Sequence, residues 1–249
     1  MHRLHNIVSM TADTNISIGN AAKLIGVSVD TLRRWDKSGK LKSIRNGLSG
    51  HRYFNLDDIQ LYQKGPMIIA RQWAFGTGAS PLDPIFHCRT RDVFQARLET
   101  LQNKLVELMG VERASLITAI AGEIGNNSFD HNLGNWPDEL GIFFSSTQNR
   151  EIVLADRGRG ILLTLRQVDA TLQTHSQALV AAFTRQISGR PTEGRGNGLK
   201  FVKRVVTTRP IGLSFQTGDA LIELSEHATQ IDVKIAPESL RGCFVVISY

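Results

Sequence analysis

Two short stretches near the start of the chain carry apolar residues at helical spacing. The first stretch has one apolar face, formed by Ala21, Ala22, Leu24 and Ile25. Gly26 is suited to end this helix in a left-handed conformation. Ser28 is a good N-cap for a second helix, which turns Leu32 and Trp35 inward. Two short helices joined by a glycine-containing turn are typical of a helix-turn-helix.

A two-stranded pattern follows these helices. Residues 41–45 and 51–54 are predicted to be strands joined by a glycine-rich tip, and residues 56–62 a closing helix. Residues 1–14 show no clear periodicity, and we interpret them as a loose arm. The sequence therefore predicts a small N-terminal domain, residues 1–64, that is a helix-turn-helix with a wing.

Glycine and proline interrupt the pattern over residues 65–87, which we interpret as a partly ordered linker. A second domain is predicted at residues 88–249, with an amphipathic helix over 89–109 and a largely buried helix over 111–130. Strands are predicted at 140–145, 152–155, 211–224, 230–235 and 242–248, with helical segments within 161–190 and at 199–206.

The composition narrows the class of protein. Hydrophobic content of 41% and charged content of 21% are ordinary for a soluble globular protein. No apolar run is long enough to span a bilayer, and no signal-peptide core follows the first residues, so we expect a cytoplasmic protein without a membrane partner. Cys88 and Cys243 lie far apart and match no metal spacing, so neither a disulfide framework nor a zinc site is predicted.

The charge is concentrated in the N-terminal quarter. Residues 1–66 hold ten Lys and Arg against five Asp and Glu, whereas residues 67–249 hold nineteen against eighteen. A positive excess confined to a helix-turn-helix pattern indicates double-stranded DNA as the partner. The candidate DNA-binding residues are Thr31, Arg33, Arg34 and Lys37 on the second helix and Arg45, His51 and Arg52 on the wing.

This N-terminal pattern resembles the winged helix-turn-helix of MerR-type regulators, especially the short versions in excisionases and in resolvases of some insertion sequences. The matching stretches are Ala21-Ala22-Lys-Leu, Gly26-Val-Ser, Thr31-Leu-Arg-Arg-Trp35, Gly39-Lys-Leu41, Gly50-His-Arg-Tyr53 and Leu56-Asp-Asp-Ile59. The resemblance implies that the second helix enters the major groove and that the wing touches backbone or minor groove. A small module that binds protein is the alternative. The long dimer helix of MerR proteins is interrupted here by Gly65-Pro66, and a homodimer stays an open alternative.

A second constellation lies in the predicted buried helix. Glu123, Asn127 and Asp130 are spaced i, i+4 and i+7, which puts them on one face. Carboxylates and a carboxamide on one stripe suit a magnesium ion, a phosphate chain and a water to be activated. Two glycine-bearing stretches follow, Asp156-Arg-Gly-Arg-Gly160 and Gly194-Arg-Gly-Asn-Gly-Leu199.

In this order and spacing, the three stretches resemble the N, G1 and G2 boxes of the GHKL ATPases. That family includes the gyrase B subunit, histidine kinases, MutL and the anti-sigma serine kinases. The resemblance covers roughly residues 88–249. It implies an α+β Bergerat fold, in which helices lie on one face of a mixed, mostly antiparallel sheet. It also implies ATP and Mg²⁺ as cofactors.

The resemblance implies roles for individual residues. Asn127 would coordinate magnesium, Asp130 would lie by the nucleotide, and Asp156 would accept a hydrogen bond from the adenine amino group. Glu123 would be the general base, and its alternative is a structural carboxylate. The remaining nucleotide-binding residues would be Gly158, Gly160, Gly194, Arg195, Gly196, Gly198, Leu199 and Lys200. Arg195 and Lys200 could equally be solvated surface charges.

One residue departs from the family pattern. Family members often carry Thr or Ser after the glycine of the last strand, whereas Gly242 is followed here by Cys243, a weak hydrogen bonder.

The two resemblances together leave two functions open. The first is a DNA-binding transcriptional regulator whose state is set by Mg-ATP binding and slow hydrolysis. The second is a serine/threonine protein kinase that acts on a protein partner and uses its DNA-binding module as an address.

Overall fold

The computed structural model describes residues 15–39, 41–46, 50–76, 82–146, 150–186 and 197–249. The chain divides into two compact units, Met1–Gly65 and Pro66–Tyr249. The expected arm at residues 1–14 and the expected turn at residues 148–149 lie outside the described residues.

The N-terminal unit is a small α+β domain. Its elements are β1 (Asn15–Ser17), α1 (Ile18–Ile25), α2 (Val29–Ser38), β2 (Ile44–Asn46), β3 (His51–Asn55) and the first part of α3 (Leu56–Phe75). The caps are those predicted, since Gly26 has φ 76° and the Ser28 side chain accepts a hydrogen bond from the Thr31 amide at 3.1 Å. The sequence did not predict β1, which pairs antiparallel with β3.

Helix α3 changes direction at Gly65, whose φ of 77° and ψ of 158° are not helical and which Pro66 follows. We predicted a linker over residues 65–87, but the residues from Pro66 onward belong to the C-terminal unit. Ile69, Ala70 and Trp73 are buried there. The glycine–proline pair therefore breaks the helix without beginning a linker, because apolar residues immediately after it find a surface to pack on.

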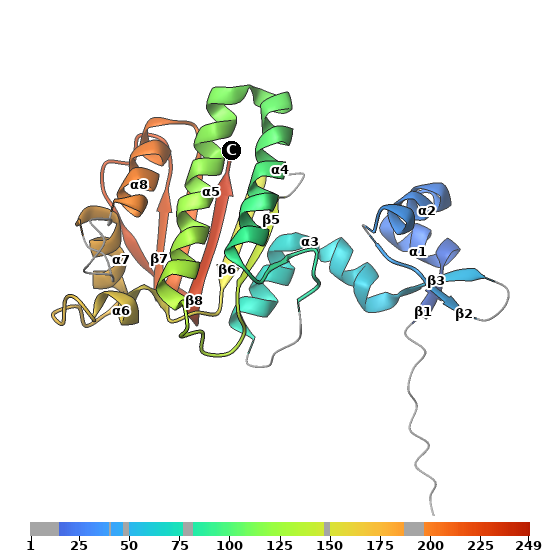
Figure 1. Cartoon of the computed structure of the whole chain (residues 1–249), viewed down its shortest axis with the longest axis horizontal. Helices are drawn as coiled ribbons and strands as arrows, with labels where there is room; N and C mark the ends of the chain where they lie inside the picture. The colour runs from blue at the N-terminus through green and yellow to red at the C-terminus, as the bar shows by residue number, and fades with distance from the viewer. Residues whose placement is uncertain (1–14, 40, 47–49, 77–81, 147–149, 187–196) are drawn as a thin grey trace, which may run out of the picture. The chain divides into compact units, whose positions relative to one another are not determined.

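The C-terminal unit is built on a five-stranded sheet in the order β4-β5-β6-β8-β7 (Figure 1). Its strands are β4 (His87–Cys88), β5 (Ile142–Ser146), β6 (Glu151–Asp156), β7 (Gly212–Leu224) and β8 (Val233–Ser248). Every pairing in the described sheet is antiparallel, where the resemblance implied a mixed sheet. Residues 230–235 and 242–248, expected as two strands, contribute to the single strand β8.

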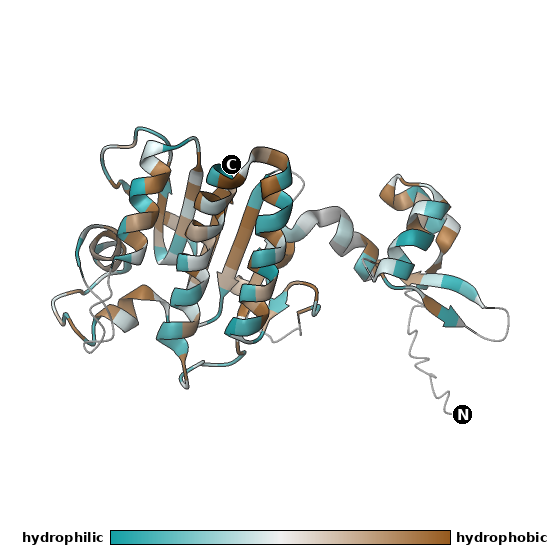
Figure 2. Cartoon of the chain, turned by 45° about the horizontal axis from the view of Figure 1, so that its top comes forward, coloured by the Kyte–Doolittle hydropathy of each residue, from teal (hydrophilic) through white to brown (hydrophobic). Residues whose placement is uncertain are grey.

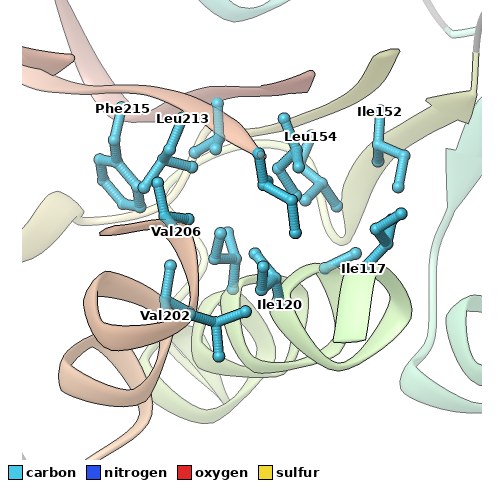
Figure 3. Close-up of a cluster of buried hydrophobic side chains, with 14 of the residues drawn as sticks. Ile117, Ile120, Ile152, Leu154, Val202, Val206, Leu213 and Phe215 are labelled. Carbon is cyan, nitrogen blue, oxygen red and sulfur yellow. The ribbon is translucent and has the colours of Figure 1, made fainter. Parts of the chain in front are cut away.

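Helices α4 (Arg91–Met109), α5 (Val111–Asn132), α7 (His175–Thr184) and α8 (Gly198–Thr208) pack on one face of this sheet, and α6 (Gly160–Leu165) follows β6 (Figure 1). The core lies between the helices and the sheet. Figure 3 shows it with Ile117, Ile120, Ile152, Leu154, Val202, Val206, Leu213 and Phe215. The predicted α+β class is confirmed. Figure 2 shows brown strands behind helices that alternate brown and teal, as expected for amphipathic helices on a buried sheet.

The opposite face of the sheet is also partly covered. Ile152 and Leu154 face the helical core, so Val153 and Ala155, which are also buried, point the other way. The second part of α3 lies on that side, where the Phe75 ring meets Phe244 of β8 edge-on at 5.9 Å between centroids. We expected helices on one face only, and the segment predicted as a linker supplies the additional cover.

A buried arginine holds α3 to the end of β6. Arg157 donates to the backbone carbonyl oxygens of Trp73 at 2.6 Å and Gly76 at 2.9 Å. Its Nε and Nη2 donate to the Asp138 carboxylate at 3.1 and 2.8 Å, and Arg241 donates to the same oxygen. Burial raises the pKa of Asp138, but these hydrogen bonds outweigh it and hold the pKa at about 2. The network therefore joins three distant segments around one guanidinium.

In none of the described helices is there a stretch both long and apolar enough to cross a lipid bilayer.

The Asp138 carboxylate should stabilise the C-terminal unit in a pH-dependent way. Its folded pKa of about 2 lies below the usual unfolded value of about 3.9, so its contribution is full above that value and is lost as the pH falls toward 2. We expect Asp138→Asn to lower the free energy of unfolding by about 1–2 kcal/mol at pH 7 and by much less near pH 2.

Urea denaturation in a Trp35→Phe background checks this expectation, because the two remaining tryptophans, Trp73 and Trp136, both lie in the C-terminal unit. Asp232→Asn, which removes an exposed carboxylate, is the matched control. A destabilisation by Asp138→Asn that is equal at pH 7 and pH 2.5 would show that the ion pairs do not produce it.

Candidate functional sites

The buried carboxylate of Asp156 ends strand β6. Its Oδ2 accepts a hydrogen bond from Ser128 Oγ at 2.8 Å, and its Oδ1 accepts one from the Gly158 amide at 2.8 Å. Burial raises the pKa of Asp156, while the bonds from Ser128, Gly158 and Cys243 act in the opposite direction. The carboxylate is thus fixed in orientation, and the thiol of Cys243 is its weakest donor.

Glycines surround this carboxylate because there is no room for side chains. A Cβ atom on Gly242 would collide with the backbone of Asp156, and one on Gly158 would collide with the Asn132 side chain. Gly160 has φ 72°, and its Cβ would meet the Arg241 carbonyl oxygen. The loop after β6 therefore packs closely around Asp156, and only glycine fits at these three positions.

Helix α5 fastens that loop through two residues that we had not singled out from the sequence. Ser128 bonds Asp156, and Asn132 accepts a hydrogen bond from the Arg159 amide at 2.8 Å while donating to the Ser128 carbonyl at 2.8 Å. A signal was present in the sequence. Ser128 and Asn132 are polar residues that continue, at helical spacing, the buried stripe of Ala121 and Ile124.

The N-terminus of α8 approaches the middle of α5. Gly198, its first residue, lies so close to Glu123 that a Cβ there would collide with the carboxylate, and Asn127 Nδ2 lies 3.8 Å from the same position. Among the described residues, no side chain caps this helix. The structure therefore brings Glu123, Asn127 and Gly198 together at the positive end of a helix dipole. Leu199 packs on the core and Lys200 is partly buried beside it.

Not every predicted residue joins this group. Asp130 forms an ion pair with Arg91 at the start of α4. Gly194, Arg195 and Gly196 lie outside the described residues. Within the described residues there is no group of three or more His, Cys, Asp or Glu side chains that could enclose a metal. Magnesium usually takes only one or two protein ligands and completes its shell with phosphates and water, so the single side chain of Asn127 fits that ion.

The predicted DNA-binding residues of α2 are exposed or half-buried. The Arg33 guanidinium pairs with Asp30 at 2.7 Å, and both side chains are largely exposed. Arg34 Nη2 donates to Thr31 Oγ1 at 3.3 Å, and Lys37 is exposed in the last turn. Such exposed pairs are weak and can be exchanged for phosphate contacts.

The three wing residues differ from one another. Arg45 and His51 are exposed on β2 and β3. Arg52 instead donates to Asp36 of α2 at 2.7 Å in a partly buried ion pair. Burial raises the pKa of Asp36, but hydrogen bonds from Arg52 and Ser43 lower it overall. Arg52 therefore attaches the wing to α2, which is a positioning role in addition to any DNA contact.

Comparisons with known proteins give two partial similarities. The chain is 28% identical over 112 residues, 45% of its length, to the type II methyltransferase M.Eco47II of Escherichia coli, of which it spans 24%. Among solved structures, it is similar to the 43K ATPase domain of Thermus thermophilus gyrase B in complex with an aminocoumarin. That match has a TM-score of 0.36 and 17% identity, and covers 64% of this chain and 40% of the other.

A family model matches the N-terminal unit. Residues 17–54 match the MerR family regulatory proteins. This range contains both helices of the helix-turn-helix and most of the wing, from Ser17 to Phe54. The resemblance inferred for the N-terminal pattern is confirmed, and residues 17–54 form a MerR-type helix-turn-helix domain.

Proposed function

We propose that this protein is a DNA-binding transcriptional regulator whose C-terminal unit binds Mg-ATP and thereby sets its DNA-binding state. The MerR-type domain supports the regulator half of this proposal. One observation supports the ATP part of the proposal. The carboxylate of Asp156 is buried and oriented beside closely packed glycines, and helix α5, which bonds it through Ser128, also bears Glu123 and Asn127.

Asp156 would recognise the base. A buried carboxylate accepts hydrogen bonds only, so it selects a ligand with an amino group at that position and disfavours one with a carbonyl oxygen. Ser128 and Gly158 hold the carboxylate oxygens, which reduces the freedom lost on binding. The weak Cys243 thiol is the donor that an adenine amino group would most easily replace.

The other end of the site suits a triphosphate. Mg-ATP, when bound, supplies a transferable phosphoryl group. Asn127 would hold the metal, and Lys200 with the free amides at the α8 N-terminus would face phosphate oxygens. Glu123 would accept the proton of an attacking water. Gly194, Arg195 and Gly196 stay part of this proposal as expected phosphate neighbours.

Arg157 provides a reason why the ligand should affect DNA binding. It directly follows Asp156, and it bonds the carbonyl oxygens at the end of α3. The first part of α3 belongs to the DNA-binding unit and is joined to the second part at Gly65, which is not helical. A ligand that stabilises one conformation of the loop after β6 would therefore also favour one arrangement of α3, and DNA would shift ATP affinity by the same factor.

A protein kinase that uses DNA as an address is the second candidate. The observation that favours it is the exposure of the Glu123 side chain, which leaves space for a partner's hydroxyl beside the carboxylate. In that case DNA affinity would not depend on nucleotide.

The role of Asp156 is tested by Asp156→Asn. The substitution replaces one carboxylate oxygen, a hydrogen-bond acceptor, by an NH₂ group, which is a donor. The adenine amino group loses an acceptor, so we expect at least a tenfold loss of ATP affinity. Isothermal titration calorimetry measures it, and Asp232→Asn is the control with the same charge change on the surface. Unchanged ATP affinity in a folded Asp156→Asn protein would remove the base-recognition role.

The role of α2 is tested by Arg33→Ala combined with Arg34→Ala. Loss of two phosphate contacts should weaken duplex binding and lower the slope of log affinity against log salt by about one for each contact. The matched control is Arg185→Ala with Lys234→Ala, which removes two exposed cations, each paired with one acidic side chain, from the C-terminal unit. If both double variants change the salt slope equally, α2 is not the DNA-binding helix.

The separate roles of Glu123 as general base and of Asn127 as magnesium ligand are tested by comparing Glu123→Ala with Asn127→Ala. Loss of a general base should slow phosphoryl transfer by about 10²–10⁴-fold and leave ATP affinity nearly unchanged. Loss of Asn127 should weaken magnesium-dependent ATP binding itself. Labelled ATP, scored separately for free phosphate, for labelled partner and for bound nucleotide, distinguishes the two.

The same pair of variants separates the two candidate functions. For a regulator, Glu123→Ala should keep the DNA affinity of the ATP-bound state long after ATP is added. For a kinase, DNA affinity should be the same with and without ATP, and only partner labelling should disappear. An equal loss of ATP binding in both variants would make Glu123 a structural carboxylate.

A further inference from the structure

A cleft lies where α4 joins α5, away from the residues discussed so far. It has a volume of about 420 Å³ and is lined by Met109, Gly110, residues 111–113, Leu116 and the segment Arg209–Ile211 that leads into β7. The first residue of β7 pairs with Ser248. The C-terminus and the α4–α5 turn lie at the same end of the sheet (Figure 1). Arg113 and Asn127 are 14 positions apart on α5, or about 21 Å along its axis, so this cleft is separate from the nucleotide site.

Arg113 is the unexplained residue of this cleft. Its side chain is half-buried, its Nε is fully buried, and within the described part of the chain it has no hydrogen-bond or ion-pair partner. Buried donors in folded proteins nearly always have an acceptor, and a cation has the strongest need of one. A half-buried guanidinium that no group of the described residues satisfies therefore suggests a bound anion as its acceptor.

A second guanidinium faces the same cleft. Arg209 pairs with the Glu112 carboxylate at 3.3 Å, and both side chains are largely exposed, at 53% and 81%. An exposed pair of this kind is weak, so Arg209 can turn toward a ligand without losing much stability. Helix α5 begins at Val111 without a side-chain cap, which adds a partial positive charge. The cleft thus presents two cationic side chains and a helix dipole against one carboxylate.

The walls of the cleft are apolar. Met109 and Leu116 pack against the main core, and Ile211 is buried. Val111 at the rim is 66% exposed, and Leu108 in the preceding turn is 77% exposed. Small-molecule sites have this composition, with mostly apolar walls and a few polar groups that fix orientation, and 420 Å³ is in their usual range. Phosphate alone would leave these walls uncovered, so they favour an anion with an apolar body.

We propose that the α4–α5 cleft binds a small amphipathic carboxylate. Its carboxylate would lie between Arg113 and Arg209, where Arg113 Nε gains the acceptor that it lacks, and its apolar body would cover Leu116 and Ile211. A planar carboxylate matches the fork geometry of arginine better than other anions of similar size. This proposal does not depend on the nucleotide proposal, because the two sites share no residue.

The test uses 4-phenylbutyrate as the probe and the full-length protein with ¹³C-labelled isoleucine and leucine methyl groups. We expect saturable chemical-shift changes at the methyls of Leu116 and Ile211. 4-Phenylbutan-1-ol keeps the apolar body without the charge, and inorganic phosphate keeps a charge without the body. Both should bind at least tenfold more weakly than the carboxylate. No saturable binding, or equal binding of either control compound, overturns the proposal.

Variants then assign the binding to Arg113. Arg113→Met should weaken 4-phenylbutyrate binding at least tenfold and Arg113→Lys by less, because lysine keeps the charge but not the fork. Arg185→Met, which removes an exposed arginine elsewhere in the C-terminal unit, should change nothing. Arg209→Met replaces an exposed side chain and should therefore fold. It provides the test if Arg113→Met does not fold. It should weaken binding severalfold. If Arg113→Met folds and binds 4-phenylbutyrate with unchanged affinity, the assignment is overturned. If Arg113→Met does not fold, unchanged affinity in Arg209→Met overturns it instead.

Discussion

The buried guanidinium of Arg157 imposes the main constraint on the C-terminal unit. An arginine cannot lose its charge on burial, so the chain must bring acceptors to it. Those acceptors come from two carbonyl oxygens at the end of α3 and from Asp138, while Arg241 of β8 donates to the Arg157 carbonyl oxygen. Three segments far apart in sequence are therefore assembled at the residue that directly follows Asp156. The close packing of the loop beside Asp156 depends on this assembly.

Helix α5 supports both candidate sites of the C-terminal unit. Its first turns line the α4–α5 cleft with Arg113, its middle carries Glu123 and Asn127, and its end fastens the loop after β6 through Ser128 and Asn132. A buried helix of this length is a rigid support, which is what precise ligand geometry requires. A ligand at either end would bear on the same element, and each site would be sensitive to how α5 packs on the sheet.

The N-terminal unit depends on a comparable but smaller contact. The Asp36–Arg52 pair joins α2 to the wing, so these two elements keep a fixed relation. The exposed guanidinium groups of Arg33 on α2 and Arg45 on the wing remain open to solvent. The segment after Gly65 then passes directly into the network around Arg157 without an intervening linker.

The sequence by itself determined the local features. The two helices with their caps at Gly26 and Ser28, the long helix bearing Glu123 and Asn127, and the α+β class all follow from periodicity and from turn residues, which act over a few positions. Only the tertiary structure decided the long-range partners. It made residues 66–75 a packed helix, attached Asp130 to Arg91 and Arg52 to Asp36, and left Arg113 without a described partner. The physical reason is that an apolar segment or a charge shows its need for a partner in the sequence, whereas the identity of that partner depends on which distant segments pack beside it.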